Sequence, residues 1–301
     1  MAPLYQIEKQ SIVFWPGCWT FYPKSVIMKK CNLIATMHFL ALVLLTSFRL
    51  HASIVYHEAD AIKSALNYKV SAASVAARTA TLHREKREIA DAAAKRAEMR
   101  MIVATASSIY EEMDLEDSGL SRKAFQSAWT GYYKLRKRGL LRKTSILSIC
   151  DFSQSSSQQR MYVIDVRNRR MLYRTYVAHG INSGEEYATS FSNQMESCKS
   201  SLGFFVTSGT YTGVNGLSLR IEGVDRGFND NARRRAIVIH GAGYVSLRIL
   251  HKYGVMGTTF GCPAIPTEMT TQIIPVVKNG SCFFIYYPSK KYLSQSKVLN
   301  S

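Results

Sequence analysis

The sequence predicts an α+β protein in which a helical N-terminal region precedes a mostly antiparallel β domain. Two observations predict this class. Residues 53–100 are rich in Ala, Lys, Arg and Glu, which favour helices. From residue 146 onward, short apolar runs alternate with polar or glycine-containing turns, which is typical of strands. With 301 residues, 47% of them hydrophobic, the chain is long enough for one sizeable core and a smaller helical part.

These patterns divide the chain into four parts. Residues 1–52 form an upstream extension with an export signal, and residues 53–145 form a helical region or stalk. Residues 146–289 form the main β domain, and residues 290–301 form a polar tail. The sequence does not determine whether residues 53–100 are ordered or how many copies of the chain assemble.

A secretory signal is predicted near the N-terminus. Two lysines after Met28 precede an apolar stretch from Cys31 to Phe48, and Ala52 follows as a small residue before a cut. We expect cleavage after Ala52 and a true start at Met28, with residues 1–27 upstream of it. The alternative is an uncleaved membrane anchor, because 18 apolar residues are about the lower limit for crossing a bilayer.

The net charge of +18 favours anionic partners such as nucleic acid, acidic lipid or a wall polymer that carries carboxylates and phosphates. The basic residues are spread along the chain and not gathered into a tail, so we expect anionic envelope polymers and no nucleic acid. Contact with the membrane is expected only through the N-terminal signal or anchor.

Cysteine usage fits an exported protein without a disulfide scaffold. Four cysteines follow the predicted cleavage point, which is too few for such a scaffold. In an oxidising compartment, one disulfide could form among Cys150, Cys198 and Cys282. Cys262 would have to stay free in order to react.

One helix is predicted in detail before the β domain. Ser121 is its expected N-cap, and Gly139 ends it. One face at helical spacing is apolar, and it consists of Phe125, Ala128, Trp129, Tyr132 and Leu135.

Seven strands and one further helix follow. The strands are expected at residues 146–152, 161–166, 171–178, 203–207, 217–222, 236–240 and 281–287. The helix begins at Thr267 and is expected to end at about Ile274, because Pro275 lacks the N–H that a helix needs.

Cys262 and His240 are the candidate catalytic pair. A thiolate is a strong nucleophile toward carbonyl carbon, and a nearby imidazole can hold it deprotonated. Cys262 follows Gly261, where backbone N–H groups could point at an oxyanion. His240 ends a predicted strand and precedes Gly241, another open stretch of backbone.

The stretch from about Leu120 to Pro288 resembles the murein L,D-transpeptidase catalytic domain family, which has a sandwich-like YkuD-type fold. The matching segments are Ile149–Phe152, Val177–Gly180, Asn182–Ala188, Ser201–Phe205, Gly227–Arg233, Ile239–Ala242 and Gly261–Ala264. Taken together, the spaced His-Gly and Gly-Cys-Pro segments are specific.

The resemblance implies an enzyme that acts on peptidoglycan stem peptides in the periplasm or cell envelope. Cys262 would attack the carbonyl that joins the third stem residue to a terminal D-amino acid, and His240 would move the proton. A thioester would form, with Gly261 near the oxyanion. An amine acceptor then gives a cross-link, and water gives carboxypeptidase activity. The implied chemistry needs no metal or organic cofactor. Further substrate-binding candidates are Tyr244, Thr259, Arg220 and Gly241.

The sequence departs from the broader family at the nucleophile. That family usually reads Ser-His-Gly-Cys-x-Arg, whereas this chain has Phe260 before Gly261 and Ala264 two residues after Cys262. The residue that holds the substrate carboxylate is therefore undetermined. Arg220 and the run Arg233–Arg235 are the candidates.

Three classes of function remain open. The first is an L,D-transpeptidase or L,D-carboxypeptidase, the second a noncatalytic wall-binding domain, and the third a structural envelope protein whose stalk carries the function. The presence of both His240 and Cys262 favours the first. His179 also precedes a glycine, and we expect a hydrogen-bonded structural role for it. The acyl acceptor could be a second stem, a protein lysine, a free D-amino acid or water.

Overall fold

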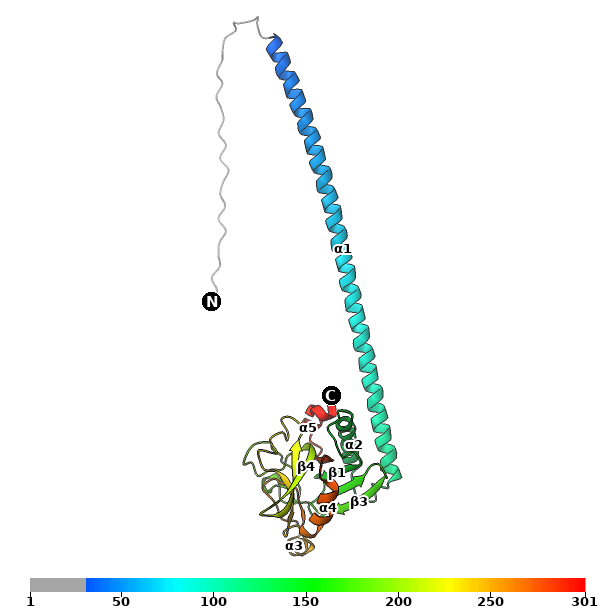
Figure 1. Ribbon diagram of the computed structural model, residues 1–301, viewed down its shortest axis with the longest axis vertical. Helices are drawn as coiled ribbons and strands as arrows, with labels where there is room; N and C mark the ends of the chain where they lie inside the picture. The colour runs from blue at the N-terminus through cyan, green and yellow to red at the C-terminus, as the bar shows by residue number, and fades with distance from the viewer. Residues whose placement is uncertain (1–30, 301) are drawn as a thin grey trace, which may run out of the picture. The chain divides into compact units, whose positions relative to one another are not determined.

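The structure is a computed structural model that describes residues 31–300 (Figure 1). The expected start at Met28 and residues 1–27 upstream of it lie outside the described residues. The chain divides into two compact units, one ending at Arg87 and the other spanning Glu88–Ser301.

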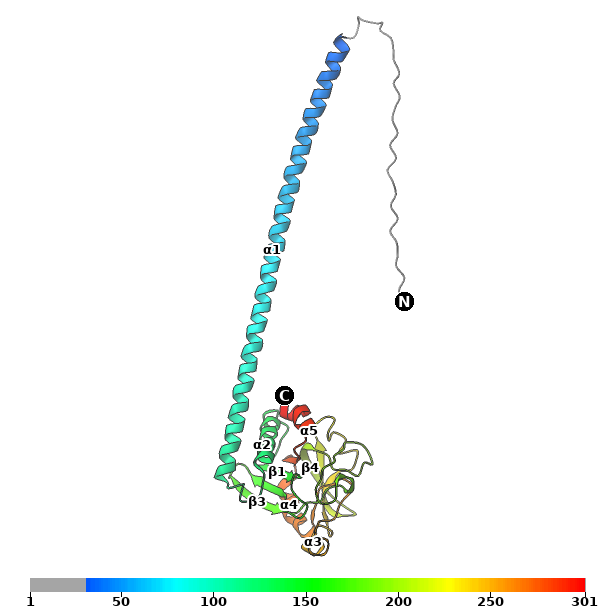
Figure 2. The same ribbon diagram turned by 180° about the vertical axis from the view of Figure 1, so that it is seen from behind.

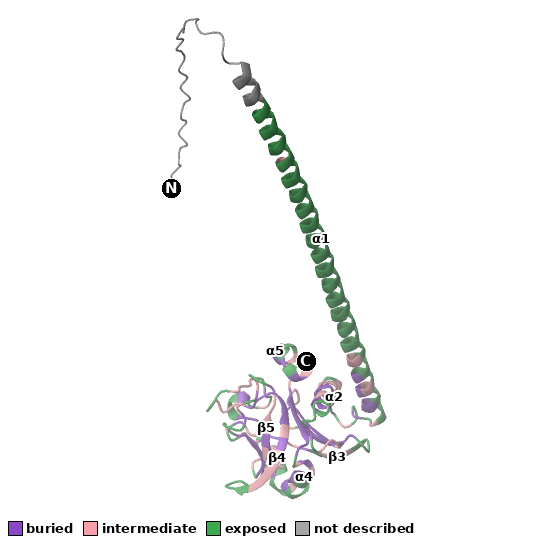
Figure 3. Cartoon of the chain, turned by 45° about the horizontal axis from the view of Figure 1, so that its top comes forward, coloured by how far each residue is buried: buried purple, intermediate pink, exposed green. Residues whose placement is uncertain are grey.

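Helix α1, Cys31–Glu112, is 82 residues long and confirms the predicted helical N-terminal region. It continues through Ala52 without a break. In the first unit its side chains from Phe39 onward are almost all exposed, as the green colour in Figure 3 shows. Among the described residues it is the one helix long and apolar enough to cross a membrane, with a mean hydropathy of 1.7 over 18 residues.

The last turns of α1 belong to the second unit and form part of its core. Ile102, Ala106, Ile109 and Tyr110 are buried there at helical spacing. The Tyr110 hydroxyl donates to the Leu120 carbonyl at 2.6 Å, which ties this end of α1 to the loop before the next helix.

Helix α2, Arg122–Lys137, matches the prediction from its apolar stripe. The Ser121 Oγ accepts a hydrogen bond from the Ala124 N–H at 3.3 Å, so Ser121 caps the helix as expected. The five predicted face residues are all buried. Gly131 brings the helix close to the sheet, because a Cβ on it would lie 2.0 Å from the Phe204 ring.

One mixed sheet of eight strands forms the centre of the second unit. The strands are β1 Ile146–Asp151, β2 Met161–Asp165, β3 Arg170–Thr175, β4 Gly203–Gly213, β5 Gly216–Gly223, β6 Val238–Ala242, β7 Ala264–Pro266 and β8 Cys282–Tyr286. Their order is β3-β2-β1-β8-β4-β5-β6-β7. Only β1–β8 and β6–β7 pair in parallel, so the predicted α+β class with a mostly antiparallel sheet is confirmed.

The remaining helices are short. They are α3 Leu247–Tyr253, α4 Thr270–Val277, α5 Lys290–Gln295 and α6 Lys297–Asn300, with single 3₁₀ turns at Ile181–Ser183 and Thr267–Met269. The prediction that the helix at α4 ends before Pro275 is wrong, because α4 continues to Val277. Ile274 and Val277 are both fully buried, and this packing outweighs the one backbone hydrogen bond that proline cannot make.

Residues 290–300, grouped above as a polar tail, fold back onto the second unit. Figures 1 and 2 both show α5 beside α2, and α6 contacts α2. Tyr292 and Val298 are buried. The Tyr292 hydroxyl donates to Asp225 Oδ2 at 2.8 Å, and the Ser296 hydroxyl donates to Asp225 Oδ1 at 2.6 Å. Asp225 therefore anchors both C-terminal helices.

Asp225 is completely buried and also holds the start of β4. Its Oδ2 accepts a hydrogen bond from the Phe204 N–H at 2.9 Å. Asn229 completes this arrangement, because its side-chain amide donates to the carbonyls of Leu202 and Phe204. The carboxylate thus accepts from three donors, one at the start of β4 and two in the C-terminal segment.

We expect Asp225→Ala to lower the free energy of unfolding by about 3 kcal/mol or more, because three buried donors would lose their acceptor. Chemical denaturation followed by tryptophan fluorescence measures this change. Asp117→Ala is the control, since Asp117 is an exposed carboxylate in the same unit. An equal loss in both variants would contradict the anchoring role of Asp225.

Candidate active site

Strand β6 places His240 on one face of the sheet. Its direct neighbours are Ser218 on β5 and Ala264 on β7. Residues opposite one another on adjacent strands point to the same face. Ile239 points to the other face, where it is buried in the main core. The His240 face is covered by a smaller apolar cluster that includes Ala242, Ala264 and the flanking ring of Tyr244.

The segment before β7 places Cys262 beside β6. Continuing the β6–β7 register back by two residues brings Cys262 beside Val238. The contacts agree, because the Val238 N–H lies 3.5 Å from Cys262 Sγ. The thiol also lies 3.8 Å from the carbonyl oxygen of Ala236, a residue held at a positive φ of 53°.

Thr259 shapes the backbone that carries Cys262. Its Oγ1 accepts a hydrogen bond from the Gly261 N–H at 2.9 Å and donates one to the Cys262 carbonyl at 2.8 Å. Gly261 has a φ of 121°, which side chains rarely tolerate, and a Cβ there would lie 2.8 Å from the Lys199 carbonyl oxygen. The Gly261 N–H is therefore occupied by Thr259.

A backbone contact fixes the ring of His240. Nδ1 lies 3.0 Å from the Gly241 carbonyl oxygen. A carbonyl can only accept, so in the neutral ring Nδ1 carries the hydrogen and Nε2 keeps a free lone pair. His240 is buried, and this contact restricts its orientation.

Cys262 precedes β7, and His240 lies on the neighbouring strand β6, two residues after Val238. Within the described residues, no hydrogen bond joins the thiol to the imidazole. Catalytic hydrogen bonds are often long before substrate binds, so the arrangement suits a nucleophile and its base.

The surroundings of Cys262 shift the pKa of its thiol in opposite directions. Burial raises the pKa of the thiol, whereas the Val238 N–H and the positive charge of Arg235 lower it. Because the net pKa lies above the ordinary value, a base is needed to remove the proton at neutral pH.

Arg235 is the residue that joins this site to its surroundings. Its guanidinium donates to the carbonyls of Ser192 at 2.7 Å and Lys199 at 2.6 Å, and to the hydroxyls of Ser197 and Ser201. It also lies close to the Cys262 loop, since a Cβ on Gly261 would be 3.1 Å from Nη2. The sequence offered Arg235 only as a carboxylate anchor, but these protein acceptors occupy it.

We expect Arg235→Gln to raise the pKa of the Cys262 thiol further, because the nearby positive charge is lost. The pH dependence of Cys262 alkylation by iodoacetamide measures this pKa. Arg234→Gln, which removes an exposed neighbouring charge, is the control. Identical profiles for the two variants would show that Arg235 does not act on the thiol.

The remaining predicted substrate-binding residues, Tyr244, Gly241 and Arg220, have different surroundings. Tyr244 is half-buried beside it, and burial together with the Cys262 charge raises the pKa of its hydroxyl. Gly241 packs tightly, because a Cβ there would lie 2.7 Å from a methyl group of Thr270. Arg220 lies on the His240 face, opposite Val238, with its guanidinium 4.3 Å from the centre of the Tyr211 ring.

His179 has the structural surroundings that the sequence suggested. Nδ1 accepts a hydrogen bond from Arg160 at 2.7 Å, and Nε2 donates to the Gly184 carbonyl at 2.9 Å. Burial and the Arg160 charge lower the pKa of His179 to about 4, so the ring is neutral at pH 7. Arg160, which is fully buried beneath it, was not recognised from the sequence.

We also looked for disulfides and metal sites among the described cysteine, histidine and acidic side chains. Cys150, Cys198, Cys262 and Cys282 are all free thiols, so none of the three other cysteines pairs in this structure. Within residues 31–300, no group of three or more His, Cys, Asp or Glu side chains is arranged to hold a metal ion.

The chain matches one family model and, over part of its length, several solved structures. The family model of the L,D-transpeptidase catalytic domain, YkuD_2, matches residues 116–286, which is more than half of the chain. No curated protein sequence matches.

Several solved structures are similar to parts of the chain. An L,D-transpeptidase from Mycobacterium smegmatis has 11% identity and a TM-score of 0.30, over 48% of this chain and 59% of that one. The helical cell shape determining protein Pgp2 from Campylobacter jejuni has 13% identity and a TM-score of 0.33, over 54% and 57%. The chain thus spans less than two thirds of the length of either protein.

The family assignment rests on the matched sequence, which begins just before α2 and ends with β8. The match includes both His240 and Cys262. The chain therefore belongs to the L,D-transpeptidase catalytic domain family.

Proposed function

We propose that this protein is an exported cysteine acyltransferase that acts as an L,D-transpeptidase on peptidoglycan stem peptides. One observation carries the proposal: the Cys262 thiol lies against the Val238 N–H of β6, two residues before His240 on that strand, and the Gly241 carbonyl leaves His240 Nε2 free to act as a base. Membership of the family supplies the reaction class.

The first half-reaction forms a thioester. His240 Nε2 takes the proton of the Cys262 thiol, and Sγ attacks the carbonyl carbon between the third stem residue and the terminal D-amino acid. The Cys262 N–H serves the oxyanion, because the Gly261 N–H is held by Thr259. As the C–N bond breaks, the imidazolium returns its proton to the leaving amine.

The second half-reaction depends on the acceptor. An amine from a second stem attacks the thioester carbonyl, gives its proton to His240 Nε2 and forms an amide cross-link. Water in the same position gives a free carboxylate and carboxypeptidase activity. The Cys262 thiol takes back a proton in both cases.

Arg220 is the proposed anchor for the carboxylate of the substrate. It lies on the His240 face of β5 and stacks on Tyr211, which leaves the donor edge of its planar guanidinium available. Two of the alternative cations are engaged elsewhere, because Arg233 pairs with Glu222 and Arg235 binds carbonyls and hydroxyls, which leaves Arg234 as the other exposed candidate.

The N-terminal apolar part of α1 supports a location in the cell envelope. This segment directs export either as a cleaved signal, our preferred interpretation, or as a retained anchor. The mass of the exported protein distinguishes the two, since cleavage after Ala52 removes the whole apolar stretch.

Product analysis tests the proposed reaction. The protein is incubated with a stem tetrapeptide, with and without an added amine acceptor, and the products are identified by mass spectrometry. We expect release of the terminal D-amino acid and a cross-linked product when the acceptor is present. Release without any cross-link would favour the carboxypeptidase. Binding to wall material without either product would favour a noncatalytic domain.

A further inference from the structure

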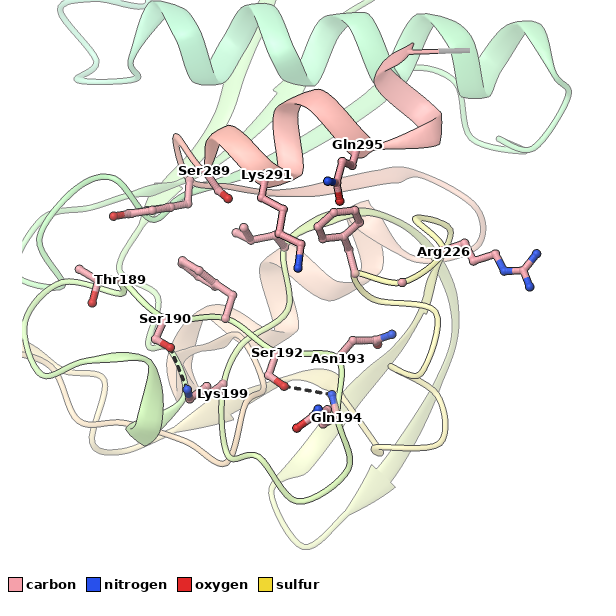
Figure 4. Close-up of a pocket in the computed structure, with 15 residues that line it drawn as sticks. Thr189, Ser190, Ser192, Asn193, Gln194, Lys199, Arg226, Ser289, Lys291 and Gln295 are labelled. Carbon is pink, nitrogen blue, oxygen red and sulfur yellow. Dashed lines mark hydrogen bonds between the residues drawn. The ribbon is translucent and has the colours of Figure 1, made fainter. Parts of the chain in front are cut away.

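A pocket of about 790 Å³ is lined in part by Ser192 and Lys199, whose carbonyls bind Arg235. It is bounded by the loop of residues 189–194, by Lys199 and by α5 (Figure 4). Its volume is within the range of small-molecule sites, roughly 300–1,000 Å³. Neither Cys262 nor His240 lines it.

The pocket has an aromatic wall and a polar lining. Phe191, Phe228 and Tyr287 supply the rings, and the ring centres of Phe191 and Tyr287 lie 5.0 Å apart. Hydroxyl and amide side chains make up most of the rest. Such a lining suits a ligand with many hydroxyl groups, whose apolar ring faces pack on aromatic side chains.

Two lysines make the pocket cationic. In Figure 4, Lys291 reaches from α5 toward the loop below it, and Lys199 approaches from the opposite side, whereas the Arg226 guanidinium points away. Lys199 Nζ donates to Ser190 Oγ at 2.8 Å, and Lys291 forms no ion pair within residues 31–300. No carboxylate lines the pocket.

Two acidic groups next to the segment of residues 226–229 are already engaged. Asp230 accepts hydrogen bonds from the Gly227 N–H at 2.7 Å and from Asn193 Nδ2 at 2.8 Å. Asp225 is buried, and through Tyr292 it fixes α5, so the helix that carries Lys291 has a defined position. The lysines therefore face a pocket in which their charge is not neutralised by the protein.

The pocket and the candidate active site share one wall. The carbonyls of Ser192 and Lys199 bind Arg235, while residues of the same segment line the pocket. Ser200 Oγ donates to the Gly261 carbonyl at 3.4 Å on the side of the nucleophile. A long substrate could thus occupy both places at once.

We propose that this pocket binds a stem-free muramic acid residue of a wall glycan, with the sugar ring on the aromatic wall and its free lactyl carboxylate between Lys291 and Lys199. The choice of a wall glycan rests on the proposed function. The preference for a saccharide that carries a carboxylate rests on the pocket itself.

Isothermal titration calorimetry on the full chain in detergent micelles tests this proposal. The chain carries Cys262→Ala so that no turnover occurs. The probe is a tetrasaccharide of alternating N-acetylglucosamine and N-acetylmuramic acid without stem peptides, and tetra-N-acetylchitotetraose is the neutral match. We expect the acidic saccharide to bind at least about tenfold more tightly, and Lys291→Gln to remove about that factor. Lys290→Gln, an exposed neighbour on α5 outside the pocket, is expected to change nothing.

Equal binding of the two saccharides, no binding of the acidic one, or equal affinity in the Lys291→Gln and Lys290→Gln variants would overturn the proposal. Circular dichroism melting shows that each variant is folded, and Lys199→Gln provides a second test of the cationic site. Acylation of the wild-type chain by a carbapenem is measured separately. Failure of glycan binding while that adduct still forms would count against the pocket and leave the proposed function standing.

Discussion

Replacing Cys262 with alanine is expected to lower the rate of D-amino acid release from a stem tetrapeptide by roughly four to six orders of magnitude. The reason is that Sγ is the only proposed atom that attacks the carbonyl, and alanine has no nucleophile. The backbone should be unaffected, because Thr259 holds this loop through the Gly261 N–H and the Cys262 carbonyl. Single-turnover product formation, followed by chromatography, measures the rate.

Cys198→Ser is the control for this result. Among the cysteines whose side chains the structure describes, Cys198 is the other partly exposed thiol. Cys150 and Cys282 are buried, and burial raises the pKa of both thiols well above the usual range. We expect near wild-type turnover in Cys198→Ser. If turnover survives in Cys262→Ala but is lost in Cys198→Ser, the nucleophile is Cys198 and not Cys262.

The second large effect is expected for His240→Gln, which should slow acylation by about a hundredfold to ten-thousandfold. Glutamine occupies a similar volume but cannot accept the thiol proton as imidazole does. Because burial raises the pKa of Cys262, the variant depends on hydroxide to form the thiolate. Its acylation rate should therefore continue to rise with pH through the range where the wild type levels off.

Pre-steady-state acylation measured between pH 6 and 10 gives both results. His179→Gln is the matched control, because His179 is a buried histidine whose ring nitrogens bind Arg160 and the Gly184 carbonyl instead of the thiol. An unchanged pH profile in His240→Gln, or an equal slope change in both variants, would show that His240 is not the base.

Local patterns predicted the elements well where one face is apolar. The stripe of α2, its Ser121 cap and the seven predicted strands depend on neighbours in the sequence, and all are present. β7, the shortest strand, was not predicted, because its three residues give no periodic signal. Pro275 misled the prediction of α4, since burial of Val277 depends on distant residues.

The sequence predicted which residue types form the candidate site. It did not predict the contacts that position them. A Gly-Cys-Pro segment and a strand that ends in His-Gly point to the pair by chemistry. Nothing local indicates that Arg235 binds the carbonyls of Ser192 and Lys199, or that Asp225 anchors Tyr292. Those contacts join residues far apart in the sequence. In the sequence alone, nothing distinguishes the charged residues involved from ordinary surface residues.

The most direct test of the account is the intact mass of the protein after incubation with a carbapenem, followed by peptide mapping. A thiolate at Cys262 should open the strained ring and leave one covalent adduct on the peptide that contains Cys262. The adduct should be absent from Cys262→Ala and slow to form in His240→Gln. An adduct that persists in Cys262→Ala, or that maps to Cys198, would contradict the assignment of Cys262 as the nucleophile.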